Sequence, residues 1–201
     1  TPLVVTTDKS VQVIVTATGK TRSYNLANGD VIWECGGQVR NVIPSPVAGH
    51  GLVFALSGYQ GHSLQAIRYD RTGDLTGTDA VAWSRNRSTP YVSSPLLYDD
   101  LIYFSGDLNA ILSCYDATTG KPLIEAERIE GMREIYASPV GAAGRVYVVG
   151  RDGITLVIKK SPQFEKLALN KLDDPTDASP AIAGRELFVP CDHYVYCLPE
   201  T

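Results

Sequence analysis

Residues 138–158 read SPVGAAGRVYVVGRDGITLVI, and this stretch decides the fold. A Ser-Pro dipeptide is followed by a turn at Ala143-Gly144, a β-type run at 146–149, a second turn at 151–153 and another β-type run at 154–158. Short apolar runs between Gly-containing turns predict antiparallel strands. Because proline cannot donate a backbone hydrogen bond to a sheet, the Ser-Pro predicts the start of a strand at the edge of a sheet.

The same pattern recurs along the chain. Its prolines are 49, 44 and 41 residues apart, and the dipeptides lie at 45–46, 94–95, 138–139 and 179–180. After Ser94-Pro95 the pattern continues through the turn 116–121 (DATTGK) into a fourth run at 122–126. The residues before Ser45 fit from the second run onward, with a hairpin turn at Asn28-Gly29. The chain therefore carries about five units of four short strands.

Four strands in each unit of 40–50 residues predict an all-β protein, a β-propeller with four-stranded antiparallel blades. We expect about five blades, the last incomplete, at approximately 1–38, 39–87, 88–131, 132–173 and 174–201. They form a single propeller, or the C-terminal part of a larger propeller of seven or eight blades. Residues 1–6 could be the first strand of the first blade or the fourth strand of the last. A β-sandwich is the alternative fold, but it does not explain marks that recur in fixed phase.

Aligning the units predicts which side chains pack. Small residues at one position of the third strand suit contact with the neighbouring blade; they are Ser23, Ala66, Cys114, Val157 and Cys197. Trp33 and Trp83 end fourth strands, where we expect them to cover the outer edge of the blade. The four cysteines form no C-x-x-C pair, which argues against zinc. They are interpreted as small buried residues, with a disulfide between Cys191 and Cys197 as the alternative.

Charge and hydropathy exclude two classes of partner. The net charge is −4 and the basic residues form no stripe, so nucleic acid is not expected. No apolar run approaches the roughly 20 residues of a membrane-spanning helix. Hydrophobic residues make up 44% and charged residues 20%, as in an ordinary globular domain.

The repeat, and above all the stretch 115–121 (YDATTGK), resembles the pyrroloquinoline-quinone-like β-propeller repeat family. The stretches 77–83 (GTDAVAW) and 89–96 (TPYVSSPL) look like large bacterial, planctomycete-type members of that family. Two branches related in fold are the quinoprotein dehydrogenases and the lipoprotein scaffold of the outer-membrane β-barrel assembly machinery. The resemblance implies a periplasmic or otherwise exported protein.

The dehydrogenase branch implies a quinone stacked on a channel tryptophan, Ca²⁺ held by acidic and amide side chains, a catalytic aspartate and often a disulfide between adjacent cysteines. No two cysteines are adjacent here, and both tryptophans are expected on outer strands. We therefore predict a non-catalytic binding or scaffolding propeller without a cofactor, and pyrroloquinoline quinone with Ca²⁺ is not expected. The alternatives are a partial or vestigial quinone-dependent dehydrogenase and a sensor domain of a larger chain.

The loops that enter the Ser-Pro strands carry the candidate binding residues. In a propeller these loops lie near the mouth of the channel, and Arg and Tyr are frequent in interfaces. The candidates are Arg40, Asn41, Tyr91, Arg133, Glu134, Tyr136 and Asp177, with Arg85-Asn86-Arg87 nearby. We predict a protein, peptide or small ligand there; the alternative is that these are solvated or packing residues.

The histidines and one polar turn are interpreted as structural. His50, His62 and His193 fall in separate turns, so a shared metal site is not expected. Asp107 and Asn109 suit a hairpin turn better than a Ca²⁺ site, which needs 6–8 oxygens.

An open arc of blades exposes strand edges and faces. Self-association, or the remaining blades of a longer chain, is therefore a further expected partner.

Overall fold

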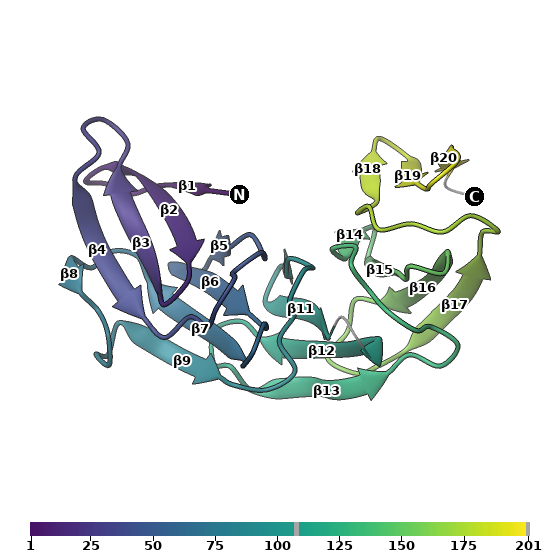
Figure 1. The fold of residues 1–201 in the computed structure, drawn as a ribbon, viewed down its shortest axis with the longest axis horizontal. Helices are drawn as coiled ribbons and strands as arrows, with labels where there is room; N and C mark the ends of the chain where they lie inside the picture. Colours follow the sequence, from purple (N-terminus) through teal and green to yellow (C-terminus); the bar gives the residue numbers. More distant parts are fainter. Residues whose placement is uncertain (107–108, 200–201) are drawn as a thin grey trace. The chain divides into compact units, whose positions relative to one another are not determined.

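The computed structural model describes residues 1–106 and 109–199, and its regular structure consists of twenty β-strands in five sheets (Figure 1). The first sheet has the order β1-β2-β3-β4-β8, with β1 at Leu3–Thr6, β2 at Val11–Ala17, β3 at Lys20–Asn25, β4 at Val31–Gly36 and β8 at Gly73–Asp74. Because β1 pairs with β2, the N-terminal segment is the first strand of the first blade. The structure thereby decides between the two placements that the sequence left open.

The other four sheets follow in chain order, each an antiparallel meander. The second comprises β5 (Val47–Gly49), β6 (Leu52–Ser57), β7 (Ser63–Arg68) and β9 (Val81–Arg85). The third comprises β10 (Leu96–Tyr98), β11 (Leu101–Gly106), β12 (Ile111–Asp116) and β13 (Pro122–Arg128). The fourth comprises β14 (Val140–Ala142), β15 (Arg145–Val149), β16 (Ile154–Lys159) and β17 (Lys166–Lys171). The fifth comprises β18 (Ala181–Ala183), β19 (Glu186–Pro190) and β20 (Val195–Pro199).

This arrangement confirms the predicted fold class. The sheets are the antiparallel blades of a propeller, about five of them, and each of the first four contains a four-stranded meander. The first sheet adds the short strand β8, which pairs parallel to β4, and the last sheet has three strands within the described part of the chain. Strands β5, β10, β14 and β18 each begin directly after a Ser-Pro and lie at the edge of their sheet. Proline therefore stands where its missing N–H breaks no ladder.

The chain divides into two compact units, which are described separately. Unit 1 consists of residues 1–91 with the turn 116–121. Unit 2 consists of the described residues of 92–115 and 122–201. Unit 1 therefore holds the first two sheets, and unit 2 holds the last three.

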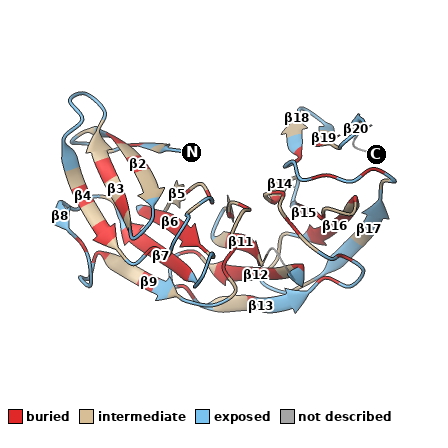
Figure 2. Ribbon diagram, viewed as in Figure 1, coloured by how far each residue is buried: buried red, intermediate tan, exposed pale blue. Residues whose placement is uncertain are grey.

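Each sheet has two faces. We call front the face that carries the small residue of the third strand, Ser23 in the first sheet, and back the opposite face. In the first sheet the front carries Ile14 and Trp33, and the back carries Val4, Val13 and Tyr24, because cross-strand partners share a face. The front of the first sheet packs against the back of the second, where Val53 and Ile67 lie opposite one another. All of these front and second-sheet residues belong to one buried cluster. Figure 2 shows buried positions, coloured red, on β3, β4, β6 and β7.

Unit 2 repeats the rule. Tyr103 and Ile124 on the front of the third sheet share a buried cluster with Val146 and Ile158 on the back of the fourth. A side chain at Gly141, in the same back row, would meet Tyr98 at 2.6 Å. Front-to-back contact is thus the way in which successive blades pack in both units.

The small residues of the third strands lie as predicted in four sheets. Ser23, Ala66, Cys114 and Val157 are buried, whereas Cys197 on β20 is exposed. No described element packs on its face, so the expectation of burial fails there. All four thiols are free: Cys35 and Cys114 are buried, and Cys191 is partly buried. The structure contains no Cys191–Cys197 disulfide.

The tryptophans do not cover an outer edge, so that prediction is corrected. Trp33 is fully buried, and its indole N–H donates to Gln12 Oε1 at 3.1 Å. Trp83 donates to the carbonyl of Ala117 at 2.9 Å, and a side chain at Gly120 would meet its ring at 2.5 Å. A large ring on a fourth strand therefore turns toward the following repeat and fills the space beside it.

Candidate functional site: loop clusters beside the Ser-Pro strands

The serines of the Ser-Pro dipeptides tie consecutive blades of unit 2 together. The N–H of Ser94 donates to Ser138 Oγ at 2.9 Å, and the N–H of Ser138 donates to Ser179 Oγ at 2.8 Å. Each hydroxyl thus satisfies a backbone donor of the preceding repeat, in a part of the chain where proline leaves fewer ladder bonds. This bonding holds the candidate loops of neighbouring repeats at fixed spacing.

The candidates in unit 1 form an aromatic cluster. Asn41 Nδ2 donates to the Tyr91 hydroxyl at 2.7 Å, and Tyr91 stacks on Tyr59 with ring centroids 4.8 Å apart and planes at 29°. Arg40 forms a backbone bridge with Tyr59. Tyr59 comes from the turn between β6 and β7, so a turn of one blade contacts both its own entry loop and the next one. We call Arg40, Asn41, Tyr59 and Tyr91 the aromatic cluster.

The candidates in unit 2 form an ionic cluster around Arg151. Its guanidinium donates to Glu134 Oε2 at 2.6 Å and to Asp177 Oδ1 at 2.5 Å. The same guanidinium lies 4.3 Å from the centroid of the Tyr136 ring, a cation–π distance. The hydrogen bonds that Arg151 donates to Asp177 and, second in effect, to Glu134 raise the pKa of Arg151 above its ordinary value. We call Glu134, Tyr136, Arg151 and Asp177 the ionic cluster.

The two clusters occupy equivalent places. Arg151, like Tyr59, lies in the turn between the second and third strands, here β15 and β16, and its N–H donates to the carbonyl of Glu134 at 3.0 Å. Sequence reasoning named the entry loops but missed both turn residues. Aligning the turn 58–61 with the turn 151–153 across the repeat was the signal that could have identified them.

The remaining candidates lie apart from these contacts. Arg133 is exposed, and no side-chain hydrogen bond or ion pair of its own is observed among the described residues. Arg85 belongs to β9 and donates to the carbonyl of Gly120 at 2.7 Å, so it supports the turn beside Trp83 instead of an entry loop. The structure thus brings together three candidates in each cluster and leaves Arg133 in solvent.

A third contact of this kind lies in the last blade. Asp174 is almost fully buried; its carboxylate accepts the N–H of Tyr194 at 3.1 Å and lies 2.7 Å from His193 Nδ1. Burial opposes its ionisation, but the hydrogen bonds from His193 and Tyr194 outweigh burial and hold the pKa of Asp174 below its ordinary value. The side-chain hydrogen bond between His193 and Asp174 raises the pKa of His193. Asp174 therefore closes the turn of the last blade, and His193 is a turn residue as expected.

Two other titratable side chains, His62 and Cys35, lie within unit 1. His62 Nδ1 lies 3.1 Å from Thr89 Oγ1, within unit 1. Burial raises the pKa of Cys35 to about 11, so this thiol is protonated near neutral pH and a poor nucleophile. Within residues 1–106 and 109–199, no group of three or more His, Cys, Asp or Glu is arranged to hold a metal ion. Asp107, considered above for Ca²⁺, lies outside the described residues.

Comparison with known proteins places the chain. Residues 1–123 match the family described as outer membrane protein assembly factor BamB. The chain belongs to this family. The repeat is thus of the pyrroloquinoline-quinone-like type, as the motifs predicted. No curated protein matches the sequence. Membrane-spanning helices are likewise not found in the described part of the chain.

One solved structure supports the fold. The computationally designed Ika8 protein superposes with a TM-score of 0.70 at 14% identity, over 98% of this chain and 57% of the designed one. The chain thus spans little more than half the length of that relative. BamB from Moraxella catarrhalis gives a TM-score of 0.47 at 13% identity, over 92% of this chain and 67% of BamB. At 14% identity, the likeness to the designed protein shows the fold and not a shared ligand.

Proposed function

We propose that the chain is a non-catalytic binding and scaffolding propeller that holds a protein or peptide partner at its entry loops. The observation that carries this proposal is the aromatic cluster, in which two stacked tyrosines and an exposed arginine lie together on loops held by the sheets. Tyr59 leaves 40% of its surface exposed although it stacks on Tyr91. Tyrosine and arginine are the residues that most often dominate binding energy in interfaces.

The exposed arginine of the aromatic cluster indicates the chemistry of the partner. No side-chain ion pair of Arg40 is observed among the described residues. An arginine beside aromatic rings suits a carboxylate-bearing segment, because the guanidinium binds carboxylates in a bidentate manner and tyrosine packs against the adjoining chain.

The ionic cluster supports scaffolding more than binding. Glu134, Asp177 and Tyr136 already satisfy Arg151, so a partner would have to replace these contacts. Its role in the proposal is to hold two entry loops of unit 2 together. We therefore place the partner on the aromatic cluster and not on the ionic one.

The family description extends the proposal to location and cofactor. A family named for the assembly of outer membrane proteins supports an exported, periplasmic scaffold whose partner is a protein. No cofactor has a role in this proposal, and pyrroloquinoline quinone with Ca²⁺ is not part of it. The bacterial origin expected from the repeat is consistent with such a location.

A peptide selection tests the proposal. A display library of random 12-residue peptides is panned against the immobilised chain, and the enriched peptides are measured against Tyr59→Ala, Arg40→Glu and the exposed control Leu26→Ala. We expect acidic, aromatic-containing peptides whose affinity falls at least about tenfold for the first two variants and stays unchanged for the control, as loss of a hot-spot residue predicts. Failure to enrich any peptide, or equal binding to all variants, would contradict the proposal.

A further inference from the structure

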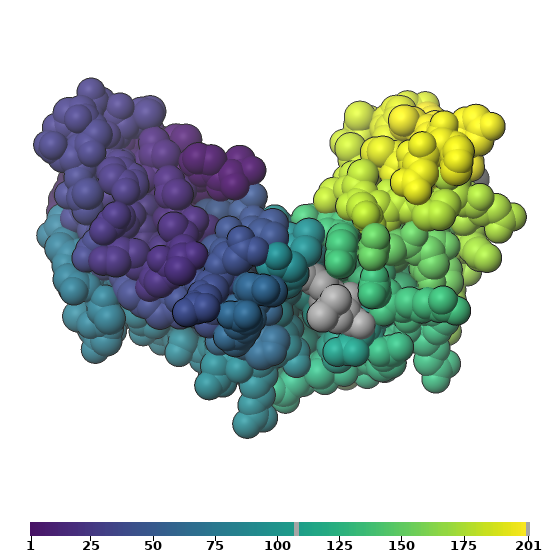
Figure 3. All heavy atoms as spheres, in the orientation of Figure 1, coloured from purple at the N-terminus to yellow at the C-terminus, as the bar shows by residue number. Residues whose placement is uncertain are grey.

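A pocket of about 390 Å³ lies between the fourth and fifth sheets, which both belong to unit 2. Ala142 and Ala168 line it from the fourth sheet, and Ile182, Leu187 and Leu198 line it from the fifth. In Figure 3 atoms of the fifth sheet, coloured yellow, lie at the surface beside atoms of the fourth, coloured green. Sites for small molecules have volumes of roughly 300–1,000 Å³ and mainly apolar walls. The pocket therefore has the size and the lining of a ligand site.

Three front positions distinguish the fourth sheet from the third. They are the last residue of the first strand, the first residue of the second strand, and the residue of the fourth strand that pairs with the small residue of the third. In chain order, the third sheet has Tyr98, Leu101 and Ile124 at these positions, and the fourth has Ala142, Arg145 and Ala168. Two large apolar side chains are thus replaced by alanine, and a third is replaced by arginine.

The three large residues fill the corresponding junction between the third and fourth sheets. Tyr98, Leu101 and Ile124 all pack in the buried cluster that joins these two sheets. Tyr98 lies so close to the fourth sheet that a Cβ at Gly141 would meet its ring at 2.6 Å. The two alanines of the fourth sheet cannot fill the same space beside the fifth. The pocket therefore originates in side chains of the fourth sheet.

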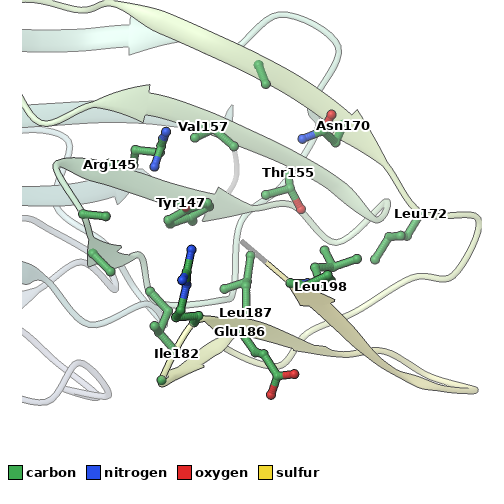
Figure 4. A pocket seen from close by; sticks show the side chains of 16 residues that line it. Arg145, Tyr147, Thr155, Val157, Asn170, Leu172, Ile182, Glu186, Leu187 and Leu198 are labelled. Carbon is green, nitrogen blue, oxygen red and sulfur yellow. The ribbon is translucent and has the colours of Figure 1, made fainter. Parts of the chain in front are cut away.

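A buried hydroxyl lines the pocket. Thr155 on β16 is only 7% exposed, and its side chain makes no hydrogen bond to another residue of 1–106 and 109–199. Buried hydroxyls normally have a partner, because a polar group that loses water without one is costly. Figure 4 shows Thr155 and Tyr147 on the side of the fourth sheet, opposite Leu187 and Leu198. The pocket thus combines apolar walls with a polar group that a ligand can satisfy.

Arg145 supplies a positive charge at the pocket. Its side chain is exposed, and within the described part of the chain it forms no ion pair. Glu186 holds the corresponding place in the fifth sheet but lies on the front, because its neighbour Leu187 lies on the back; Figure 4 shows the carboxylate directed away from the pocket. Lys159, which pairs with Arg145, binds Glu165 at 3.1 Å. The guanidinium of Arg145 is therefore available to an anionic ligand.

We propose that this pocket binds a small amphipathic carboxylate, a molecule with one apolar chain and one carboxylate group. The Arg145 guanidinium binds the carboxylate, because its fork of N–H donors matches two carboxylate oxygens. The apolar chain lies between Ala168 and the two leucines Leu187 and Leu198, in the space that large side chains occupy at the preceding junction. The site consists of residues of unit 2, whereas the aromatic cluster belongs to unit 1, so it goes beyond the peptide binding proposed above.

A titration with octanoate tests the site, and octanol is the uncharged control. Amide chemical shifts of the isotope-labelled chain are followed by NMR as each compound is added. We expect saturable shifts with octanoate that are largest at the residues lining the pocket. Octanol should shift the same residues but bind more weakly, since it lacks the carboxylate that Arg145 binds.

Two variants separate the charge of the pocket from its shape. Arg145→Gln removes the guanidinium, so the affinity for octanoate should fall at least about tenfold while the affinity for octanol stays unchanged. Ala168→Leu narrows the pocket, so both affinities should fall at least about tenfold. Arg133→Gln removes another exposed arginine of unit 2 and should bind both compounds as the wild type does. Circular dichroism establishes that each variant is folded.

Three results would overturn the proposal. The first is the absence of saturable octanoate shifts at the pocket residues. The second is equal binding of octanoate by Arg145→Gln and the wild type, because the arginine would then not bind the carboxylate. The third is binding of octyl phosphate at least about tenfold tighter than octanoate, which would make phosphate the recognised group. The peptide selection concerns residues of unit 1, so its outcome leaves these results unaffected.

Discussion

The junction between the first and second sheets is a buried apolar cluster, whereas a pocket of about 390 Å³, open to solvent, lies between the fourth and fifth sheets (Figure 4). The two junctions differ in the residue at one position of the fourth strand. Trp33 of β4 pairs with Ser23 and fills the first junction, and Ala168 of β17 pairs with Val157 and lines the pocket. At this place on the fourth strand, the residue is thus large beside the buried cluster and small beside the pocket.

The pocket is lined mainly by apolar side chains of both sheets. Tyr147 and Val157 line it from the fourth sheet, and Ile182, Leu187 and Leu198 line it from the fifth (Figure 4). Protein interiors are packed as densely as organic crystals, and the side chains that line this open pocket lack part of those contacts. We infer that the junction beside Trp33 is better packed than the junction beside Ala168, and the following variants test that difference.

The largest effect is expected for Trp33→Ala. Removing this fully buried ring takes away its apolar contacts and leaves Gln12 Oε1 without the indole donor. Truncation of a buried Trp costs about 3–5 kcal/mol in the free energy of unfolding. Urea unfolding followed by circular dichroism measures it. Leu26→Ala, exposed in the same unit, is the control, and a loss below about 1 kcal/mol for Trp33→Ala would refute the importance of the ring.

The second variant is Gly120→Ala, which changes the residue that contacts Trp83. Gly120 has φ +69°, and a Cβ there would lie 2.5 Å from the Trp83 ring. Alanine in the left-handed region costs about 1–2 kcal/mol, and the displaced ring adds to that cost. Gly144→Ala, with φ +71° and open space around it, is the matched control, because it carries the backbone cost alone. Equal losses in the two variants would show that the ring is not held by this contact.

The third variant should reverse the comparison. Ala168→Leu places additional methyl groups into the pocket, where we expect a gain of about 1 kcal/mol in the free energy of unfolding. Calorimetry measures the shift in midpoint. Leu169→Ala on the neighbouring, exposed position of β17 should change little. A destabilised Ala168→Leu would mean that the fourth and fifth sheets are already as close as their side chains allow.

The smallest effect distinguishes the two loop clusters. Salt screens exposed ion pairs, so the loss of stability in Arg151→Gln should shrink as NaCl is raised, whereas the loss in Tyr59→Ala should not. Thermal unfolding at low and high NaCl provides the measurement. The same salt dependence in both variants would contradict the assignment of one cluster as ionic and the other as aromatic.

Features that depend on one residue were predicted correctly from the sequence, whereas contacts between residues distant in the sequence were not. The Ser-Pro marks predicted strand starts because the missing N–H of Pro139, like that of its counterparts, is a property of one residue. The ionic cluster needs Arg151 from a turn and Glu134 and Asp177 from two entry loops to converge, which spacing alone does not show. The burial of Trp33 was not predicted for a similar reason. Its position on the outer strand does not show on which face of the sheet the ring lies.

A thermal-shift titration with pyrroloquinoline quinone, with and without Ca²⁺, tests whether these blades are a binding scaffold or the remnant of an enzyme. The proposed function predicts no change in the unfolding midpoint under either condition. A ligand present at 100 times its dissociation constant and bound only by the folded chain adds about 2.7 kcal/mol. A Ca²⁺-dependent rise of that size would contradict the proposal and favour a quinone-dependent dehydrogenase.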